Sequence, residues 1–330
     1  MKALVYTGPK SVEYRDAVDP TPNAGEVLIR IESVGICGSD MHAYLGHDDR
    51  RPAPLILGHE AAGVIVGGSR DGERVTINPL VTCGDCFACR KGRDNLCPTR
   101  QIISMQPREG AFAQFVAMPE RNLVTVPEHV SYSQASLAEP IACGWHAVRM
   151  ALGISDTKAS DVKALVLGGG AIGLGAALSL RAQGVTSVTI IEPNDNRRTF
   201  LNDACGQTAQ AAAADADMNT YDIIVDGVGY AATRQTASAA ARPGGIIAHI
   251  GLGQATDGLD IRRLTLQEIT FFGTYTYTAE DFRQTAQAIF DGALGPLDWF
   301  EERALADGQL AFQDILNGRV ASPKLILKPN

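Results

Sequence analysis

The stretch Ala164–Gly173, which reads Ala-Leu-Val-Leu-Gly-Gly-Gly-Ala-Ile-Gly, decides the fold of a large part of this chain. Its first four residues are apolar and predict a buried strand, and a helix-like stretch follows the glycines to about Gln183. In a strand–turn–helix unit of this kind, Gly168 permits a tight turn, Gly170 lets the backbone approach a ligand, and Gly173 lets the helix pack closely on the strand. The stretch therefore predicts the first βα unit of a nucleotide-binding sheet.

The ligand expected at this turn is a dinucleotide. Free amides at a helix N-terminus bind phosphate, and Ile172 lies in that turn. Glu192 ends the next apolar run, where its carboxylate can accept hydrogen bonds from an adenosine ribose and would repel a 2′-phosphate. We therefore expect NAD as the cofactor. Arg197 and Arg198, close after this acid, keep NADP as an alternative, although they could instead be solvated charges on a helix. A glycine-rich turn without a cofactor is the other alternative.

Beyond this unit, the pattern of apolar residues divides the chain into two regions. From about Lys163, strand-like runs alternate with helical stretches, which predicts a parallel α/β sheet. The strand-like runs are Ala164–Leu167, Val188–Ile191, Ile223–Val225, Ile246–Ala248 and a β-like run over Phe271–Tyr277. The first third instead predicts a small all-β unit of short strands at Val27–Ile31, Val64–Val66, Arg74–Ile77 and Ala113–Val116. A helix over Asp281–Phe290 and a last strand over Leu325–Leu327 are expected near the end.

Length, charge and cysteine usage limit the classes of function. The chain has 330 residues, enough for about two domains, and a net charge of -8 argues against a general affinity for nucleic acid or anionic membranes. The first ten residues lack the apolar run of a signal peptide, and there are seven cysteines, an odd number. Because no apolar run reaches the length of a membrane span, we expect a soluble, cytoplasmic protein that acts on a small molecule.

Four cysteines within fifteen residues form the strongest chemical motif. Cys83, Cys86, Cys89 and Cys97 have the spacing x2, x2, x7. Four thiolates in one compact lobe are typical of a closed, tetrahedral structural zinc site. A pair of disulfides or an iron–sulfur cluster is the alternative, since thiolates also bind iron.

A second group of metal-binding residue types precedes this lobe. Cys37, Ser39 and His42 lie within six residues, and His59 and Glu60 follow after a short interval. A lone cysteine or histidine in a β-rich region is more often a core residue or a satisfied polar group. These residues indicate a metal site only when they are considered together.

Taken with these motifs, the whole chain resembles the zinc-containing medium-chain dehydrogenase/reductase family, particularly its polyol and threonine dehydrogenase branch. Several motifs carry the resemblance in addition to the glycine fingerprint and the four-cysteine lobe. They are Ile36–Asp40, Gly58–Glu60, Glu139-Pro140, Arg242–Gly245 and Lys324–Pro329. The resemblance implies a GroES-like catalytic domain over 1–139, to which 278–330 returns, and a Rossmann NAD-binding domain over 140–277. It also implies a homodimer or homotetramer.

The same resemblance implies two zinc ions per chain, one structural and one catalytic. Cys37 and His59 match the positions of catalytic zinc ligands. The third ligand is expected to be Glu139 or Glu60 rather than Cys143, although relatives differ here. Ser39 and His42 match a relay that carries the substrate proton outward, and either could instead be an ordinary turn or surface residue.

The implied reaction is oxidation of a secondary alcohol of a polyol, sugar alcohol or sugar acid to the ketone, with hydride transfer to NAD. An amino alcohol like threonine, or a sugar phosphate, is an alternative substrate. The chain departs from the sorbitol dehydrogenases at one place. They carry an Arg-Tyr pair where this chain has Gly273–Tyr277, which contains no arginine, so the usual contact with a polyol is not expected. Tyr44 or the pair Arg50-Arg51 could contact substrate instead. A quinone-reductase-like enzyme without catalytic metal and a non-catalytic nucleotide-binding zinc protein remain as other classes.

Overall fold

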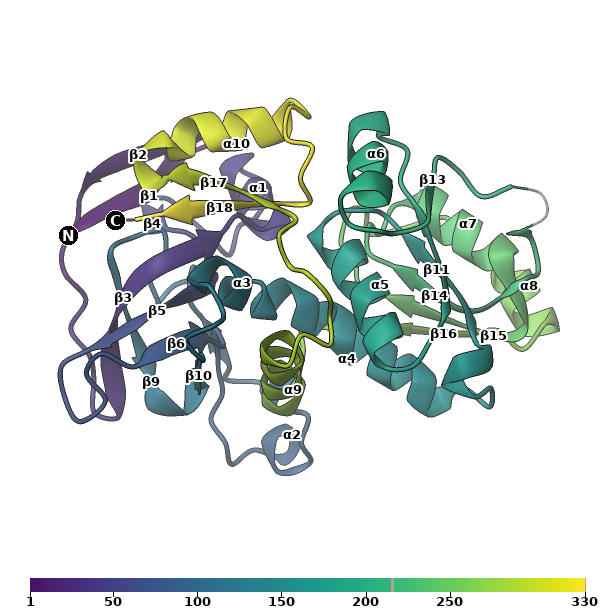
Figure 1. Ribbon diagram of the computed structural model, residues 1–330, viewed down its shortest axis with the longest axis horizontal. Coiled ribbons are helices and arrows are strands. Elements are labelled where there is room, and N and C mark those ends of the chain that lie inside the picture. Colours follow the sequence, from purple (N-terminus) through teal and green to yellow (C-terminus); the bar gives the residue numbers. More distant parts are fainter. Residues whose placement is uncertain (215–216, 330) are drawn as a thin grey trace. The chain divides into compact units, whose positions relative to one another are not determined.

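The computed structural model describes residues 1–214 and 217–329 of the chain, which divides into two compact units (Figure 1). The first unit comprises Met1–Glu139, Thr278–Asp291 and Phe300–Asn330, and the second comprises Pro140–Tyr277 and Gly292–Trp299. Asn330 itself lies outside the described residues. The first unit contains both predicted metal sites, and the second contains the predicted dinucleotide site.

The first unit is built around a seven-stranded sheet whose central strand is β3 (Glu26–Gly35). It pairs antiparallel with β5 (Glu60–Val66), β9 (Phe115–Pro119) and β18 (Lys324–Lys328). The sheet order β10-β6-β5-β3-β18-β17 is completed by strands β10 (Leu123–Thr125), β6 (Arg74–Ile77) and β17 (Phe300–Ala304). Along β3, Ile29 and Ile31 are fully buried, whereas Arg30 between them is exposed. This two-residue period is the reason the sequence forms a half-buried strand.

Smaller elements close the core of this unit. Two further sheets have the orders β2-β1-β4 and β7-β8. Their strands are β1 (Lys2–Gly8), β2 (Ser11–Asp16), β4 (Leu55–Ile56), β7 (Leu80–Val81) and β8 (Gln101–Ile102). The helices and 3-10 turns are α1 (Gly38–Tyr44), α2 (Phe87–Arg90), η1 (Asp94–Leu96), η2 (Glu120–Asn122), α3 (Tyr132–Ser136), α9 (Ala279–Phe290), η5 (Leu305–Asp307) and α10 (Gly308–Leu316). Helix α10 connects β17 to β18, which run parallel and therefore need such a crossover.

The second unit is a six-stranded parallel sheet of order β13-β12-β11-β14-β15-β16. Its strands are β11 (Lys163–Leu167), β12 (Ser187–Ile191), β13 (Ala209–Gln210), β14 (Tyr221–Asp226), β15 (Ala241–His249) and β16 (Thr270–Gly273). Its helices are α4 (Ala138–Ile154, which begins before the unit boundary), η3 (Ala159–Asp161), α5 (Ala171–Ala182), α6 (Asp195–Asp203), α7 (Ala231–Ala240) and α8 (Ile261–Leu266). The chain moves outward from β11 in both directions, and right-handed crossovers then place α5 and α7 on opposite faces. This is the doubly wound order of a Rossmann fold, as predicted.

The predicted strands of both units are confirmed, with shifts at their ends, except that only the first three residues of the β-like run Phe271–Tyr277 lie in a strand, β16. Arg74–Ile77 matches β6 without change, whereas Ala113–Val116 begins two residues before β9. The predicted helix over Asp281–Phe290 begins two residues earlier, because the Thr278 side chain accepts a hydrogen bond from the Asp281 amide and caps α9. Among the described residues, no helix is both long enough and apolar enough to span a membrane.

One predicted boundary differs from the structure. The sequence assigned all of 278–330 to the catalytic domain, but Gly292–Trp299 belongs to the second unit. Leu294, Leu297 and Trp299 in this segment are buried. Their apolar side chains explain why the segment packs in a core before the chain returns at Phe300.

Candidate active site and metal centres

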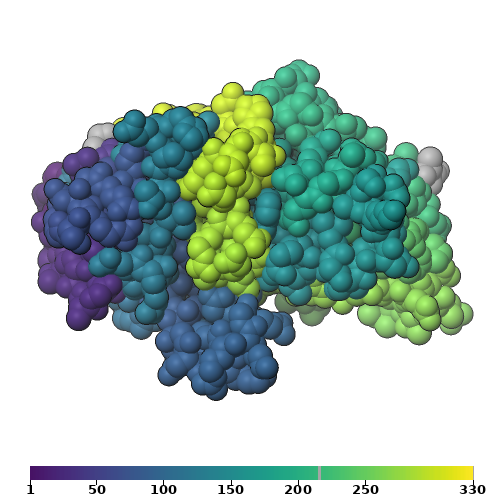
Figure 2. All heavy atoms as spheres, turned by 60° about the horizontal axis from the view of Figure 1, so that its bottom comes forward, coloured from purple at the N-terminus to yellow at the C-terminus, as the bar shows by residue number. Residues whose placement is uncertain are grey.

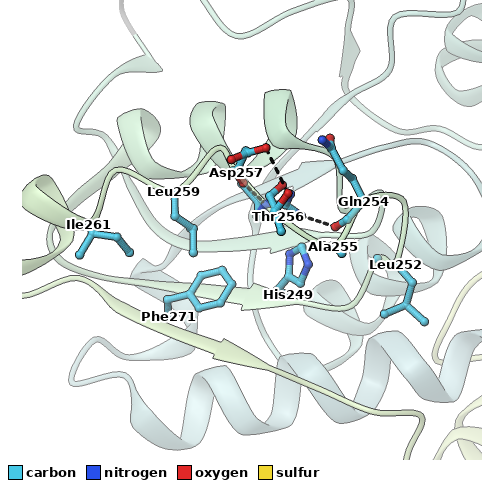
Figure 3. Close-up of a pocket in the computed structure, with 11 residues that line it drawn as sticks. His249, Leu252, Gln254, Ala255, Thr256, Asp257, Leu259, Ile261 and Phe271 are labelled. Carbon is cyan, nitrogen blue, oxygen red and sulfur yellow. Dashed lines mark hydrogen bonds between the residues drawn. The ribbon is translucent and has the colours of Figure 1, made fainter.

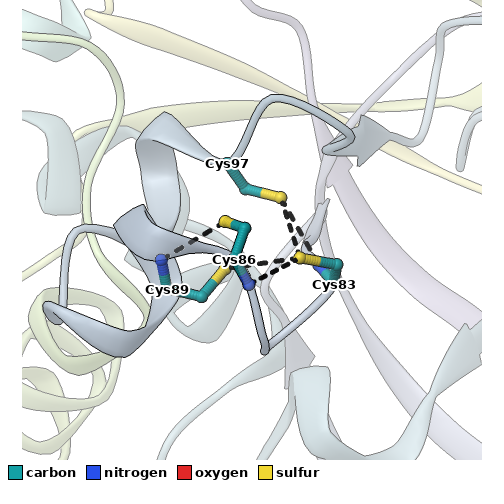
Figure 4. Close-up of side chains that lie close together, drawn as sticks. All are labelled: Cys83, Cys86, Cys89 and Cys97. Atoms are coloured by element: carbon teal, nitrogen blue, oxygen red, sulfur yellow. Dashed lines mark hydrogen bonds between the residues drawn. The ribbon is translucent and has the colours of Figure 1, made fainter.

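The four-cysteine lobe gathers its sulfur atoms around one point (Figure 4). All four Sγ atoms lie within 4.8 Å of one another, with Cys83 Sγ 3.5 Å from Cys97 Sγ and 3.9 Å from Cys89 Sγ. Tetrahedral zinc–thiolate bonds of about 2.3 Å require sulfur separations of roughly 3.8 Å. None of the four cysteines of the lobe forms a disulfide. The donor set thus fits a single structural zinc ion and contradicts the disulfide alternative.

The lobe backbone is organised to stabilise thiolates. The amides of Cys83, Cys86 and Cys89 donate to the sulfurs of Cys97, Cys83 and Cys86 at 3.4 to 3.5 Å. Hydrogen bonds to a charged form favour that form. The lobe projects as blue spheres from the first unit in Figure 2, and the carboxylate of Asp94 ties it to that unit by accepting from the Ala279 amide at 3.2 Å.

A second group of donors lies at the junction of β3 and β5. The donor atoms of Cys37, His59 and Glu60 lie within 4.8 Å of one another. Cys37 follows β3 and caps α1, and the pairing of Gly35 with Glu60 places the end of β3 beside the start of β5. Antiparallel pairing thus unites residues that are more than twenty positions apart. A thiolate, an imidazole and a carboxylate form a donor set that fits zinc with a position left for substrate.

Asp40 organises the backbone around this group. Its fully buried carboxylate accepts from the amides of Cys37 at 2.9 Å and Gly58 at 3.2 Å, and lies 3.5 Å from His59 Nδ1. Burial alone would raise the pKa of Asp40, but His59 and then Arg51 outweigh it and hold the pKa below its ordinary value. Asp40 therefore ties the amides of Cys37 and Gly58 to the histidine, a role that the sequence reading did not assign.

Lys324 forms a buried ion pair with Glu60. Its Nζ donates to Oε1 at 2.7 Å and to the Ile36 carbonyl at 3.0 Å, and lies 2.6 Å from Oε2. Burial would lower the pKa of Lys324, but the charge of Glu60 outweighs that effect and raises it. A Cβ on Gly35 would lie 2.1 Å from Glu60 Oε2, so the pair also requires glycine at this position. The sequence motif contained Lys324, but only the fold reveals its partner.

The other predicted catalytic residues lie at different places. Ser39 Oγ is 3.5 Å from His59 Nε2, whereas His42 is exposed on α1. Glu139 is buried in the first turn of α4 and adds to the negative field on Lys324. It is not among the three donors grouped above, and Cys143 belongs to the second unit.

The two candidate substrate contacts are both structural. Tyr44 is 1% exposed, packs against Phe312 at a centroid distance of 4.9 Å and accepts a hydrogen bond from Gln309. Arg50 is exposed and pairs with Asp48, and Arg51 is buried against the same carboxylate. The expectation that Tyr44 lines a pocket is wrong, because the ring belongs to the core of the first unit.

The glycine-rich turn of the second unit has the geometry that the sequence predicts. Gly168 has a φ of +94°, which side-chain-bearing residues rarely adopt. A Cβ on Gly173 would lie 1.7 Å from the Gly168 carbonyl oxygen, whereas a Cβ on Gly170 would meet open space. Helix and strand therefore touch at Gly173, and the backbone at Gly170 is free to receive a phosphate group. The half-buried Ile172 follows in the first turn of α5.

Glu192 links this turn to the end of β12. Its buried carboxylate accepts from the amides of Gly169 at 3.0 Å and Asn194 at 2.8 Å. Arg197 Nη1 lies 3.8 Å from the same carboxylate. The acid is thus held at the place where an adenosine ribose is expected, and one arginine partly compensates its charge.

A cavity of about 680 Å³ lies at the carboxyl end of β15 (Figure 3). The rings of His249 and Phe271, 5.5 Å apart, form one wall, and the loop with Gln254 and Thr256 forms another. The residues of the glycine-rich turn do not line it. The cavity is therefore not the phosphate site that the sequence predicts.

Asp226, at the end of β14, shapes this edge of the sheet. Its carboxylate accepts from the amides of Val228 at 3.0 Å and Gly229 at 2.9 Å, and contacts His249 Nδ1 at 3.2 Å. Burial would raise the pKa of Asp226, but the neighbouring His249 and the hydrogen bonds from these amides hold it below its ordinary value. Sequence reading missed this residue, although an acid that ends an apolar strand and is followed by glycine is a usable signal.

Fold, metal-binding residues and glycine-rich turn together define a zinc-binding, nucleotide-dependent dehydrogenase. Residues 23–128 match the model of the alcohol dehydrogenase GroES-like domain, and residues 171–291 match that of the zinc-binding dehydrogenases. The chain belongs to this family of zinc-binding alcohol dehydrogenases, in its polyol dehydrogenase branch.

Named relatives and solved structures agree with this assignment. The chain is 35% identical to sorbitol dehydrogenase of Bacillus subtilis, over 84% of this chain and 82% of the relative. It is 29% identical to L-galactonate-5-dehydrogenase of Escherichia coli K12, over 89% of this chain and 88% of the relative. An alcohol dehydrogenase structure from Escherichia coli CFT073 with NADH has a TM-score of 0.87 and 25% identity, and covers 99% of each chain. A zinc-binding dehydrogenase structure from Sinorhizobium meliloti 1021 with NADP has a TM-score of 0.85 and 25% identity, and also covers 99% of each chain.

Proposed function

We propose that this chain oxidises a secondary alcohol of a polyol, sugar alcohol or sugar acid to the ketone and transfers hydride to NAD. The single observation that carries the proposal is the group of Cys37, His59 and Glu60, whose donor atoms lie within 4.8 Å of one another in a buried, charge-balanced setting. The similarity of the chain to a sorbitol dehydrogenase and a galactonate dehydrogenase supports the substrate class.

Two zinc ions per chain are part of the proposal. Cys83, Cys86, Cys89 and Cys97 would hold the structural ion, and Cys37, His59 and Glu60 would hold the catalytic one. When bound there, the catalytic zinc would act as a Lewis acid on the substrate hydroxyl. We place Glu139 near the metal without direct ligation, since it is buried and acts on Lys324.

The side chains of this site have separate tasks. Asp40 and Lys324 keep the two ligands that they contact, His59 and Glu60, in place and balance their charge. Ser39, whose hydroxyl is 3.5 Å from His59 Nε2, is the group that would accept the substrate proton. From there the proton would reach solvent through the exposed His42.

The cofactor that we propose is NAD. Glu192 offers a fixed carboxylate for the ribose hydroxyls, and this charge would repel a 2′-phosphate. Arg197, 3.8 Å from that carboxylate, supports NADP as the alternative, and solved relatives contain either cofactor.

Replacing Glu192 with alanine is expected to reduce the preference for NAD over NADP by about 10- to 100-fold, because charge-assisted hydrogen bonds to the ribose are lost. The measurement is kcat/KM for both cofactors with one alcohol. Arg197→Ala is the matched control, and it should increase the preference for NAD. A wild-type enzyme that already prefers NADP would show that the role of Glu192 is different.

The experiment that tests the function combines metal content with a substrate panel. Polyols, aldonates, sugar phosphates and threonine are each scored by reduction of NAD and NADP, and zinc per chain is measured before and after a chelator. We expect about two zinc ions, one of which leaves readily together with the activity. One zinc per chain, or activity that persists after loss of the second ion, would contradict the catalytic-metal assignment.

We also propose a cytoplasmic homodimer or homotetramer. The odd number of cysteines, four of which lie together in the proposed zinc lobe, favours a reducing compartment. In the second unit, β16 pairs with β15 alone among the described strands, and Leu252, Ile261 and Leu266 are strongly exposed. An unpaired strand edge and exposed apolar side chains are typical of a surface that another chain covers. The native mass in solution distinguishes the two assemblies from a monomer.

A further inference from the structure

Ser104 has an unusual backbone for a buried residue. Its φ is +70°, in the left-handed region that favours glycine, and its exposed fraction is 0%. A residue other than glycine holds this conformation only at a cost in stability, and such residues concentrate at functional sites. Ser104 comes shortly after β8, outside every motif that the sequence analysis identified. A turn without a further role would be more stable with glycine at this position.

The Ser104 hydroxyl lies beside His59, the histidine that we propose as a zinc ligand, with its Oγ 3.3 Å from Nδ1. The Asp40 carboxylate lies 3.5 Å from the same nitrogen, and Ser39 Oγ lies 3.5 Å from Nε2 on the other side of the ring. Two acceptors therefore gather at Nδ1. If Nδ1 carries the proton, Nε2 is left with a lone pair for a metal ion.

Arg51 holds the Ser104 backbone in this position. Its side chain is 2% exposed, and its Nε donates to the Ser104 carbonyl at 3.0 Å. Its Nη1 donates to Asp48 at 2.6 Å and to the Ser39 carbonyl at 3.5 Å. One buried guanidinium thus ties together the backbones of the two serines whose hydroxyls lie on either side of His59. Because the planar guanidinium directs these bonds at fixed angles, lysine cannot reproduce them all.

We propose that Arg51 and Ser104 form a positioning pair for His59. Arg51 fixes the strained Ser104 so that the Ser104 hydroxyl, together with the Asp40 carboxylate, accepts a hydrogen bond from Nδ1–H of His59. This hydrogen bond orients the ring so that Nε2 faces the catalytic zinc. The inference rests on the proposed function, since it requires zinc at His59. Neither residue touches the substrate, and both act through the histidine.

The test measures zinc retention rather than turnover alone. In the holoenzyme, Ser104→Gly and Ser104→Ala are expected to speed the loss of the second zinc to a chelator by about 10- to 100-fold, the usual effect of removing a partner of a metal-bound histidine. The zinc of the four-cysteine lobe should stay in place. The absorption spectrum of protein reconstituted with cobalt at the labile site should change, because the histidine is less firmly oriented.

Lys10→Gly is the matched control. Lys10 has a φ of +62° in the first unit, so glycine relieves the same kind of strain there, at a site that contacts none of the proposed ligands. This variant should keep both zinc ions at the wild-type rate of loss. Equal rates in Lys10→Gly, Ser104→Gly and wild type would overturn the proposal, because Ser104 would then be only a strained turn.

Arg51→Lys extends the test to the second member of the pair. It should also speed zinc loss, and the double variant with Ser104→Gly should lose zinc no more than about twofold faster than the worse single variant, since both act through one hydroxyl. Multiplicative effects would show that the two residues act independently. If Ser104→Gly does not fold, the rate of zinc loss in Arg51→Lys alone tests the proposal, and a wild-type rate in that variant would overturn it. A wild-type protein with one zinc would instead refute the proposed function, and two zincs with unchanged rates in the variants would refute only the positioning pair.

Discussion

Replacing Cys37 with alanine is expected to lower kcat/KM by about 10³-fold or more, since a catalytic zinc contributes several kcal/mol to the reaction and each 1.4 kcal/mol corresponds to a factor of ten. The thiolate is one of three grouped donors, and its loss leaves only His59 and Glu60. NAD binding should persist, because the glycine-rich turn belongs to the other unit. The measurements are steady-state kinetics, zinc per chain and the Kd for NAD. His59→Ala should give the same result.

Two other cysteines provide the controls for this prediction. Cys205→Ala changes a half-buried thiol of the second unit that is in neither metal group, and it should retain wild-type turnover. Cys143→Ala tests the alternative third ligand, and loss of zinc in this variant would favour Cys143 over Glu60. Retained turnover in Cys37→Ala with full zinc content would show that the catalytic site lies elsewhere.

Replacing Cys86 with serine is expected to destabilise the protein by about 3–5 kcal/mol, because the loss of a structural metal is among the few single changes with effects of this size. The Cys86 sulfur is a member of the four-thiolate group and also caps α2 by accepting a hydrogen bond from the Cys89 amide. We expect a protein with one fewer zinc, a lower melting temperature and weaker assembly. Thermal unfolding, zinc content and native mass measure these effects.

Cys205→Ser is the matched control, since it makes the same chemical change outside the lobe. Any folded fraction of Cys86→Ser should turn over substrate at a rate close to that of wild type, because the lobe has no position open to substrate. A stable Cys86→Ser protein that has selectively lost turnover would contradict the structural role of the lobe.

The doubly wound unit could be predicted from the sequence because its signals are local. A buried parallel strand and the turn that follows it are contiguous in sequence, and the tight turn expected at Gly168 and the close packing expected at Gly173 match their geometry. The boundary at Gly292 could not be predicted in this way. Short apolar segments such as Leu294–Trp299 do not specify which of two cores they join, and packing alone decides this.

The candidate active site could be predicted only in part. Cys37, His59 and Glu60 were recognised because metal-binding residue types recur at short intervals, and the pairing of β3 with β5 brings them together. The assignment of Tyr44 to a substrate pocket was wrong, since sequence spacing places a residue on α1 without saying which face of that helix is covered. Helix α10 covers that face through Phe312.

By itself, the sequence determined the kinds of elements, the four-thiolate spacing and the glycine-rich turn, because these depend on neighbouring residues and on short-range backbone geometry. Only the tertiary structure decided what surrounds the metal-binding residues. Lys324 meets Glu60 across 264 positions, and Arg51 reaches Ser104 across 53. Such contacts arise when strands far apart in sequence pair in one sheet and bury charged groups that must then find partners. The proposed metal ligands are thus visible in the sequence, whereas the residues that hold them in place become visible only in the folded chain.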